Sequence, residues 1–553
     1  MFKKTDVNTQ IDLFKSTSNV LSGKAMRVFE DQMAWHNLFR VNVTSRIDET
    51  IFSPLFSKGM GAPNASIRVM VSMMILKEGN GWSDEQLFEQ CSFNLLVRSA
   101  LGFINLDEKI PAESTYYFLR KKVGAYKEET GINLFDLAFT SLTKGQAIDF
   151  EVSGKSIRMD SKLLGSNIAW LSRYELIHET IRLFCLDIKD TIGLYPALSA
   201  HQMTINNVLN EQGNKVVYRS TDEEVKTKLH DLGLLAHALI PLYNSLSSVH
   251  YDTLKRVFSE QFQVSSDGMS VTARKKEEIS TDSVQSPHDT DCHYRNKDGN
   301  QVKGYTINLT ESTDNDKLNL ITNVEVKVAS SADNSFLETS VQNTQEIVVD
   351  KIENIHADGA YHSPDNQAFC TLKHIELLIN AIQGPQPRYD LELSQTGQLI
   401  VIDNHTSQTI PATKAENKEK WRIKHENKYR YFTQKEITAA NLRKKIANIP
   451  QEILNKRNNV EATIFQLGYH YPNDKTRYRG ILKHKMWAIV RCMWVNFVRI
   501  KNFINLKPIH ANFETIYHTM RLFIVQIIAQ ITMLEDMLFK YNSSKAKPFL
   551  CHY

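Results

Sequence analysis

The sequence predicts an α/β protein whose mixed-sheet core is interrupted by a helical insertion and by a smaller β-rich insertion. A helical N-terminal domain and a helical C-terminus complete the predicted fold. Three observations predict this class: a helical pattern over about 65–142, a change of hydrophobic period to two at Ile157, and strand patterns that resume after a helical stretch at about 167–262. Strands mixed with helices in this order are typical of an interrupted α/β core, and the chain has no glycine-rich phosphate loop of either common type.

The composition is that of a multidomain globular protein. The chain has 553 residues, of which 42% are apolar, so it exceeds one ordinary domain. The formal net charge is only +4, but basic residues cluster late in the chain. These clusters are Lys414, Lys418, Lys420, Arg422, Lys424, Lys428 and Arg430, and Lys475, Arg477, Arg479, Lys483 and Lys485. A local excess of positive charge indicates a polyanionic partner.

Other features argue against metal-finger, exported and membrane proteins. The six cysteines have no spacing that would bring four ligands to zinc, so we expect reduced thiols in a cytosol. The first residues lack the apolar core of a signal peptide. Because polar residues interrupt the apolar segment 522–539, we expect a packing helix there rather than a membrane span.

The sequence divides into a helical N-terminal domain at 1–145, a second domain at 146–505 and a C-terminal helix at 506–553. The helical insertion is expected at about 167–288, with a polar return linker at 265–288, and the β-rich insertion at about 385–440. In the first domain, Ser83 begins a Ser-x-x-Gln capping box, and Ser114 is expected to cap a helix over 116–122.

Strand patterns in the second domain begin with Ile157 and Met159, which alternate with Arg158 and Asp160. Residues 301–309 and 318–328 look like an antiparallel pair. A short strand at 352–357 ends at Asp358, and the Ser363-Pro364 pair then provides an N-cap and a first-turn proline. Further strand-like runs follow at 374–382, 399–402 and 421–432.

A helix bracketed by Pro450 and Gly468 is expected to carry Glu461 on its apolar stripe. A carboxylate that faces a core costs several kcal/mol unless a cation or a hydrogen-bond donor offsets it. Arg457, one turn earlier, is an available partner. A structural Arg457–Glu461 pair is therefore one interpretation of this helix.

Asp160, Asp358 and Glu461 together form a candidate metal site. Each aspartate lies at or just past a strand pattern, where open α/β sheets commonly gather ligands. Carboxylates from separate strands and a helix repel each other unless a divalent metal holds them. Considered alone, each aspartate is also explained as an ordinary turn residue.

Five segments resemble the DDE transposases of bacterial insertion sequences. The first-aspartate motif is similar to 157–167 (IRMDSKLLGSN), the second to 357–366 (ADGAYHSPDN), the glutamate helix to 457–467 (RNNVEATIFQL) and the arginine-rich turn to 477–480 (RYRG). The helical N-terminal domain of these transposases is similar to 55–63, 83–87, 101–103 and 111–115. The resemblance covers about 50–505 and rests on the order and spacing of the five segments.

The resemblance implies a ribonuclease-H-like core and a DNA cleaving and joining enzyme with Asp160, Asp358 and Glu461 as its catalytic and metal-binding residues. It implies Mg²⁺ as cofactor, with Mn²⁺ as a substitute. The implied partners are double-stranded DNA, both terminal inverted repeats and target, and a second subunit. It also implies a bacterial, cytoplasmic and nucleoid-associated protein. Two positions depart from the Tyr-x2-Arg-x3-Glu-x6-Lys signature of many relatives, because Leu454 replaces the tyrosine and Gly468 the lysine.

Expected DNA contacts are Arg457, Arg477, Tyr478, Arg479, Trp421 and Arg422. Trp421 combines a stacking surface with flanking cations, a mixture suited to an unpaired base beside phosphates. Its alternative role is to pack against its own hairpin. For Trp487 and Trp494 we expect core or inter-domain packing. The residues of 289–293 are expected to be solvated loop groups, with a supporting role near the metal site as the alternative.

Two other functions are compatible with the sequence. One is a decayed or repurposed transposase that binds DNA without cutting it, for which the missing tyrosine and lysine leave room. The other is a metal-dependent nuclease without strand transfer. Because one active site serves both cleavage and joining, the sequence does not separate a nuclease from a transposase.

Overall fold

The structure, a computed structural model, describes residues 1–5, 12, 14–59, 61–268, 270–297, 299–314, 317–382, 387–394, 397–415, 420–425 and 428–506. Residues 1–499 form one compact unit, and 500–553 belong to a second, of which 500–506 are described. Apart from its first residue, the expected C-terminal helix at 506–553 therefore lies outside the described residues, as does the segment 522–539. No helix within the described ranges is long and apolar enough to cross a membrane.

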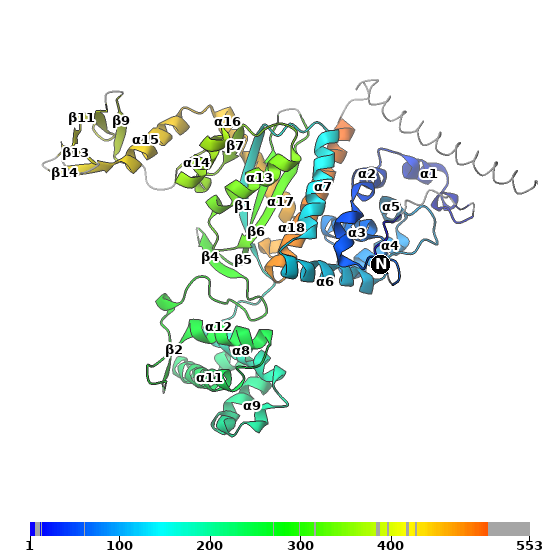
Figure 1. Cartoon of the computed structure of the whole chain (residues 1–553), viewed down its shortest axis with the longest axis horizontal. Coiled ribbons are helices and arrows are strands. Elements are labelled where there is room, and N and C mark those ends of the chain that lie inside the picture. The colour runs from blue at the N-terminus through cyan, green and yellow to red at the C-terminus, as the bar shows by residue number, and fades with distance from the viewer. Residues whose placement is uncertain are drawn as a thin grey trace, which may run out of the picture. The chain divides into compact units, whose positions relative to one another are not determined.

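A six-stranded mixed sheet is the main sheet of the larger unit (Figure 1). Its strands are β1 (Ser156–Gly165), β4 (His293–Lys297), β5 (Asn300–Ser312), β6 (Ile321–Val328), β7 (Asn354–Ala357) and β8 (Glu376–Ile379). The hydrogen-bonded order is β4-β5-β1-β7-β8, and β6 pairs with β5. β1 is antiparallel to β5 and parallel to β7, which is parallel to β8. The expected antiparallel pair, β5 and β6, is confirmed.

The alternation along β1 gives the two faces of the sheet different chemistry. Ile157 and Met159 are fully buried in a core that also contains residues of α13 (Leu337–Ile347) and α14 (Pro364–Lys373). Arg158 and Asp160 point to the opposite face, because successive side chains of a strand alternate. Helix α17 (Asn458–Gly468) contacts β1 and β5. The period of two in the sequence therefore separates an apolar face from a face that carries charge.

Seven helices, α1 to α7, form the N-terminal part of the chain as described. They are α1 (Gly23–Glu30), α2 (Trp35–Asn42), α3 (Ile67–Asn80), α4 (Asp84–Phe93), α5 (Leu95–Ala100), α6 (Glu113–Thr130) and α7 (Leu134–Asp149). The capping box of Ser83 and Gln86 is confirmed at the start of α4. The expected cap at Ser114 is wrong, because α6 begins one residue earlier and its N-cap is Ala112. A serine just before a helical pattern therefore does not by itself locate the first turn of the helix.

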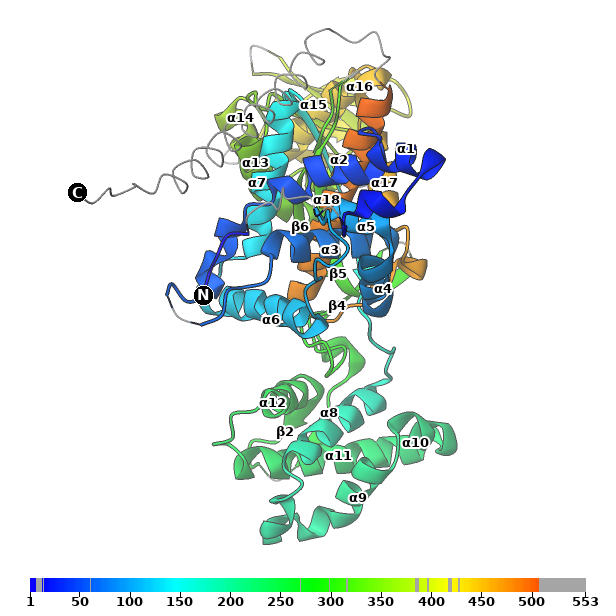
Figure 2. The same cartoon turned by 90° about the vertical axis from the view of Figure 1, so that its right-hand side faces the viewer.

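The stretch between β1 and β4 folds into a helical subdomain, which we define as α8–α12 (Figure 2). Its helices are α8 (Arg173–Asp187), α9 (Gln202–Asn210), α10 (Gly213–Arg219), α11 (Asp222–Leu242) and α12 (Val249–Gln261). Its buried core includes Phe184, Leu235 and Leu254. The expected polar linker at 265–288 is only partly correct, since β2 (Phe262–Val264) pairs with β3 (Val271–Ala273) and Val284 is buried in this core.

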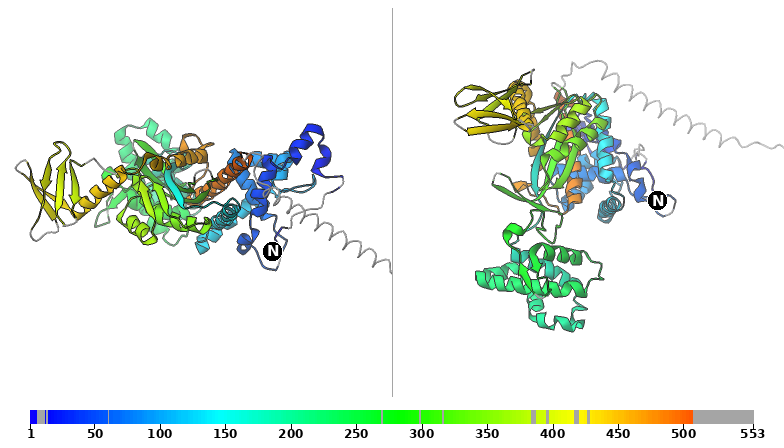
Figure 3. Two further views of the ribbon diagram at one scale, coloured as in Figure 1. Left: turned by 90° about the horizontal axis from the view of Figure 1, so that it is seen from above. Right: turned by 60° about the vertical axis from the view of Figure 1, so that its left-hand side comes forward.

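A second small unit, the β subdomain, follows β8 (Figure 3). It consists of β9 (Tyr389–Leu393), β10 (Leu399–Asp403), β11 (Thr409–Pro411), β12 (Thr413–Lys414), β13 (Lys420–His425), β14 (Lys428–Thr433) and α15 (Gln434–Ala447). Two three-stranded antiparallel sheets share a core with α15 that includes Leu391, Val401 and Phe432. The β-rich character expected for this region is confirmed.

The helix expected from Pro450 to Gly468 is broken in two. α16 (Gln451–Asn455) ends before Lys456, and α17 begins at Asn458. Pro450 is the N-cap of α16 rather than its first residue. The expectation of one continuous helix is therefore wrong, and Arg457 lies at the junction. A last long helix, α18 (Ile481–Leu506), follows.

Candidate active site

Asp160 lies on the charged face of β1. Its carboxylate accepts a hydrogen bond from the amide of Ser161 at 2.9 Å, and its side chain is 13% exposed. Burial raises the pKa of the Asp160 carboxyl, and the nearby cation Arg457 opposes this shift. The pKa is raised overall, so an anion at this position is stabilised less than it would be in water.

Asp358 immediately follows β7, the parallel neighbour of β1. The next residue must be glycine, because a Cβ at Gly359 would collide with the carbonyl of Ala381. A short helix, η8 (Gly359–Tyr361), then begins, and the Tyr361 hydroxyl donates a hydrogen bond to Asn308 of β5 at 2.5 Å. These contacts fix the turn that carries Asp358, while its own side chain stays 40% exposed.

Glu461 lies in the first turn of α17, but not on its buried stripe. The buried residues of this helix are Val460, Thr463, Ile464 and Leu467. The Glu461 side chain is 61% exposed, and Phe465, one turn later, is 66% exposed. The expectation that Glu461 faces the core is therefore wrong. The reason is that successive helical residues are about 100° apart, so packing of Val460 and Ile464 leaves Glu461 toward solvent.

The three carboxylates meet at Arg457. Its Nη2 atom lies 3.3 Å from Asp160 Oδ2, 3.8 Å from Asp358 Oδ2 and 3.5 Å from Glu461 Oε1. The Arg457 side chain is 14% exposed, and its Nε atom is buried without a hydrogen-bond partner. The expected Arg457–Glu461 pair is thus present, but as one of three contacts made by the same guanidinium.

This cluster contains two more carboxylates than cations. Carboxylate oxygens are the preferred protein ligands of Mg²⁺, and an excess of negative charge attracts divalent cations. The donor set therefore fits a divalent metal. The carboxylates nevertheless contact the guanidinium rather than one another. Among the described residues, no three His, Cys, Asp or Glu side chains are grouped closely enough to hold a metal ion as they stand.

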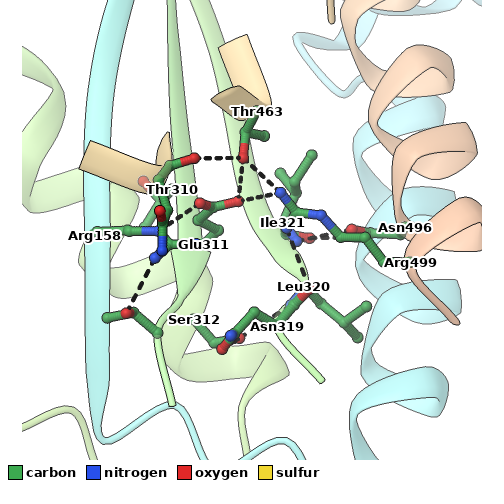
Figure 4. Close-up of polar contacts among 12 residues, drawn as sticks. Arg158, Thr310, Glu311, Ser312, Asn319, Leu320, Ile321, Thr463, Asn496 and Arg499 are labelled. Carbon is green, nitrogen blue, oxygen red and sulfur yellow. Dashed lines mark hydrogen bonds and ion pairs between the residues drawn. The ribbon is translucent and has the colours of Figure 1, made fainter. Parts of the chain in front are cut away.

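A buried charge network lies on the same face of the sheet (Figure 4). Glu311 of β5 is fully buried and is the cross-strand neighbour of Arg158, whose Nε lies 2.5 Å from Glu311 Oε1. The other oxygen, Oε2, lies 2.7 Å from Arg499 Nη2 and accepts a hydrogen bond from Thr463 at 2.8 Å. Glu311 therefore joins β1, α17 and α18 through one carboxylate.

The same network reaches the residue next to Arg457. Arg158 Nη1 donates to the carbonyl of Lys456 at 3.1 Å, an acceptor left free by the break between α16 and α17. Sequence reasoning missed Glu311, because the expected strand at 301–309 ended before it, whereas β5 extends to Ser312. The signal that could have found Glu311 is its charge beside the apolar residues of this strand, because a buried charge requires a partner of opposite charge.

The arginine-rich turn at 477–480 is held against other parts of the chain. Arg477 donates to the carbonyls of Gly81 and Trp82 at the end of α3, at 2.9 and 3.1 Å. The Tyr478 hydroxyl donates to Glu78, and burial raises the pKa of Tyr478. Arg479 Nε donates to the carbonyl of Asn167 at 2.6 Å. The turn is thus a junction of β1, the N-terminal helices and α18, and its two arginines are exposed.

Asp289 has a different place from the solvated loop that was expected. It is buried, accepts hydrogen bonds from the Tyr305 hydroxyl at 2.6 Å and the Gly480 amide at 2.9 Å, and also accepts one from Ser166. Asp291 accepts from the Ile481 amide at 3.3 Å. The solvated-loop expectation is therefore wrong for Asp289. These carboxylates lie at the start of α18, where the helix dipole favours negative charge.

The glycine that replaces the signature lysine has a cation beside it. A Cβ added to Gly468 would lie 3.8 Å from the Nζ of Lys162 and would meet no closer atom than Asp474 Oδ1 at 3.5 Å. Lys162 follows Asp160 on the same face of β1, and its ammonium pairs with Asp474 at 2.5 Å. The ammonium of Lys162, on β1, thus places a positive charge near position 468, where the family signature has a lysine on the helix itself.

The hairpin of β13 and β14 has one apolar and one basic face. Trp421 is partly buried against the core of the β subdomain, opposite Phe432, which is the packing role left open by the sequence. Arg422 is exposed and paired across the strands with the exposed Tyr431, and its guanidinium lies 5.6 Å from the ring centre of Tyr429. Exposed cations alternate with buried residues along β13. The exposed face therefore combines tyrosine rings with positive charge.

Comparison with known families agrees with the helical N-terminal part. Residues 27–122 match a family model described as Transposase domain (DUF772). Residues 27–122 are thus similar to a transposase domain, and we call this matched region the transposase domain. It extends from α1 into α6 and includes Glu78 and Gly81, which contact the turn at 477–480. Comparisons with curated proteins and with solved structures gave no match.

The transposase domain packs against α18 through aromatic side chains. Trp494 contacts Phe39 and Phe497, and a Cβ at Gly79 would overlap its ring. Trp487 is 2% exposed. The expected packing role of both tryptophans is confirmed, and both lie in α18, which follows α17, the helix that carries Glu461.

Proposed function

We propose that the protein is a DDE transposase that cleaves DNA at terminal inverted repeats and joins the ends to target DNA. The observation that carries the proposal is the meeting of Asp160, Asp358 and Glu461 at one point on the charged face of the sheet. The transposase domain at 27–122 supports the same class independently. A ribonuclease-H-like core is supported by the antiparallel group β6-β5-β1 followed by parallel β7 and β8.

In this proposal Asp160, Asp358 and Glu461 would hold divalent metal ions. The ion is Mg²⁺, for which Mn²⁺ can substitute. Bound there, two metal ions would supply activation of water or of a DNA 3′-hydroxyl and stabilisation of the leaving oxygen. Asp160 would supply a metal ligand from the central strand β1, with Asp358 just after β7 and Glu461 on α17 as the other ligands. The buried Arg158–Glu311–Arg499 network keeps these elements in register.

Double-stranded DNA is the proposed partner, with Arg457, Arg477, Tyr478, Arg479 and Arg422 as its expected contacts. Trp421, the remaining expected contact, packs on the core of the β subdomain instead. Two ends must be brought together, so a homodimer in the DNA complex is also proposed. The exposed arginines of the 477–480 turn lie between the transposase domain and β1. Their exposure supports a phosphate-binding role.

Lys162 is proposed as an additional phosphate contact. Lys162→Gln should weaken duplex binding and reduce the slope of log affinity against log salt by about one, the value for one lost phosphate contact. The double variant Lys162→Gln with Gly468→Lys should recover the slope, because a side chain fits at 468 and restores the charge. Filter binding at several salt concentrations measures this. An unchanged slope in Lys162→Gln would contradict the role.

The exposed face of the β13–β14 hairpin is proposed to contact an unpaired stretch of DNA. Tyr431→Ala should lose about 1–3 kcal/mol of affinity for single-stranded ends, the usual value for a stacked base, with little effect on plain duplex. Trp421→Ala should instead lower the thermal midpoint and weaken both substrates equally, because its ring packs on the core. Selective loss of single-strand binding in Trp421→Ala would assign the stacking role to Trp421.

The proposed function is tested with purified protein and a supercoiled plasmid that carries the coding region with its flanking DNA. We expect magnesium-dependent nicking at the two flanks, followed by joining to a second plasmid. Binding without nicking would favour a repurposed DNA-binding protein. Nicking without joining would favour a nuclease.

A further inference from the structure

We propose that Arg457 is the internal counter-cation of the carboxylate cluster and that a divalent metal ion must displace its guanidinium in order to bind. This inference rests on the proposed function, since it concerns the same three carboxylates. It adds a regulatory step to that site: the metal-free protein keeps its ligands paired with its own arginine.

The contacts of one atom carry the inference. Arg457 Nη2 lies within 3.3 to 3.8 Å of an oxygen of Asp160, Asp358 and Glu461. It thus occupies the point toward which the three side chains converge. A metal ion and this nitrogen cannot both occupy that point, so binding of one excludes contact with the other.

The junction between α16 and α17 gives Arg457 a means of leaving. The residue is the N-cap of α17, and the preceding Lys456 is the C-cap of α16. The Lys456 carbonyl is held by Arg158, so the backbone is anchored, while the long side chain is joined to the cluster by three ion pairs, one of which is also a hydrogen bond to Asp160. Its Nε makes no hydrogen bond. The guanidinium therefore leaves without breaking a helix or a backbone contact.

Charge explains why the exchange is favourable. One guanidinium opposes three carboxylates, so their mutual repulsion is only partly neutralised. A divalent ion removes more of the repulsion than a single positive charge. Once displaced, Arg457 becomes available to a DNA phosphate, which reconciles its place in the cluster with its proposed DNA contact.

The test is a thermal unfolding titration of the full chain, without DNA, with magnesium or calcium chloride as the probe. Arg457→Gln should have a lower midpoint than the wild type in EDTA, because the carboxylates lose their counter-charge. It should also reach half of its metal-induced rise at about tenfold lower metal concentration, within the usual range for coupled binding. Arg219→Gln, with the same change of net charge at an exposed position of α10, should match the wild type in both respects. An unchanged metal midpoint in Arg457→Gln overturns the inference.

A second variant covers the case in which Arg457→Gln does not fold. Arg457→Lys keeps the charge but replaces the planar guanidinium with one compact ammonium, so its metal midpoint should fall below that of the wild type. An equal midpoint overturns the inference. Failure of the proposed function is separate, because it appears as absent nicking. Metal midpoints that shift as expected in a protein that never nicks DNA would support the counter-cation and reject the transposase activity.

Discussion

Glu461→Gln is expected to abolish magnesium-dependent strand cleavage, a loss of about 10⁴-fold or more, as when one member of a group acting as a unit is removed. Folding should be nearly unaffected, within about 0.5 kcal/mol, because the side chain is 61% exposed and substitutions at such positions cost little. Arg457 keeps Asp160 and Asp358 as partners in this variant. Nicking of supercoiled DNA and thermal unfolding, measured on the same preparations, give both quantities.

Asp160→Asn should also abolish cleavage but should raise stability slightly at neutral pH in the absence of metal. The folded-state pKa of Asp160 is raised, so the ionised form weakens the folded state, and that penalty is present above the folded pKa. The difference between the variant and the wild type should therefore shrink as the pH falls through the folded pKa toward the ordinary carboxyl range. Asp358→Asn should abolish cleavage in the same way.

The structural-pair interpretation makes the opposite prediction for Glu461→Gln. If the glutamate only neutralises Arg457, its replacement lowers the thermal midpoint and leaves cleavage in place. A well-folded Glu461→Gln protein that still cuts DNA would refute the proposed triad. Glu436→Gln, which alters a capping-box glutamate at the start of α15, is a control that should cut normally.

Glu311→Ala is expected to cause the largest loss of stability, about 3–5 kcal/mol, because it leaves buried charges without a partner. Arg158 and Arg499 both pair with this fully buried carboxylate. The thermal midpoint should fall clearly, and cleavage should fall with it since α17 and β1 lose a shared contact. Glu129→Ala, at an exposed position near the end of α6, should leave both unchanged.

A triple variant separates lost charge from lost packing. Replacement of Arg158 and Arg499 with Met and of Glu311 with Leu removes all three charges together, and buried ion-pair triads are often replaceable by apolar groups without loss. We expect the triple variant to recover much of the midpoint lost by Glu311→Ala. A triple variant less stable than Glu311→Ala would contradict the view that uncompensated charge is the cause.

Much of the fold was predictable because its signals are local. The alternation at Ile157 and Met159 predicts β1 and its buried face, and the capping box at Ser83 predicts the start of α4. Ser363 caps α14 with a proline in its first turn, as expected. Each of these signals depends on the period of a strand or helix or on a cap a few residues away, so neighbouring residues suffice to predict it.

The two predictions that failed around α17, a continuous helix and a buried Glu461, also have a physical cause. The sequence from Pro450 to Gly468 contains no glycine or internal proline that marks a break, so a single helix is the simplest interpretation. The break at Lys456 and Arg457 accompanies a tertiary contact, the hydrogen bond from Arg158 to the Lys456 carbonyl. Tertiary packing likewise decides which side of α17 faces the sheet, and Glu461 lies on the exposed side.

The sequence by itself determined which residues are candidates: two carboxylates at strand ends, a third on a helix, and a basic turn beyond it. Only the tertiary structure decided how they meet. It brings Arg457 among all three carboxylates and buries Glu311 between two arginines, through pairs that are far apart in the chain. Charge pairing depends on distance in space, and hydrophobic periodicity reports only which face a residue occupies, not which distant residue lies opposite.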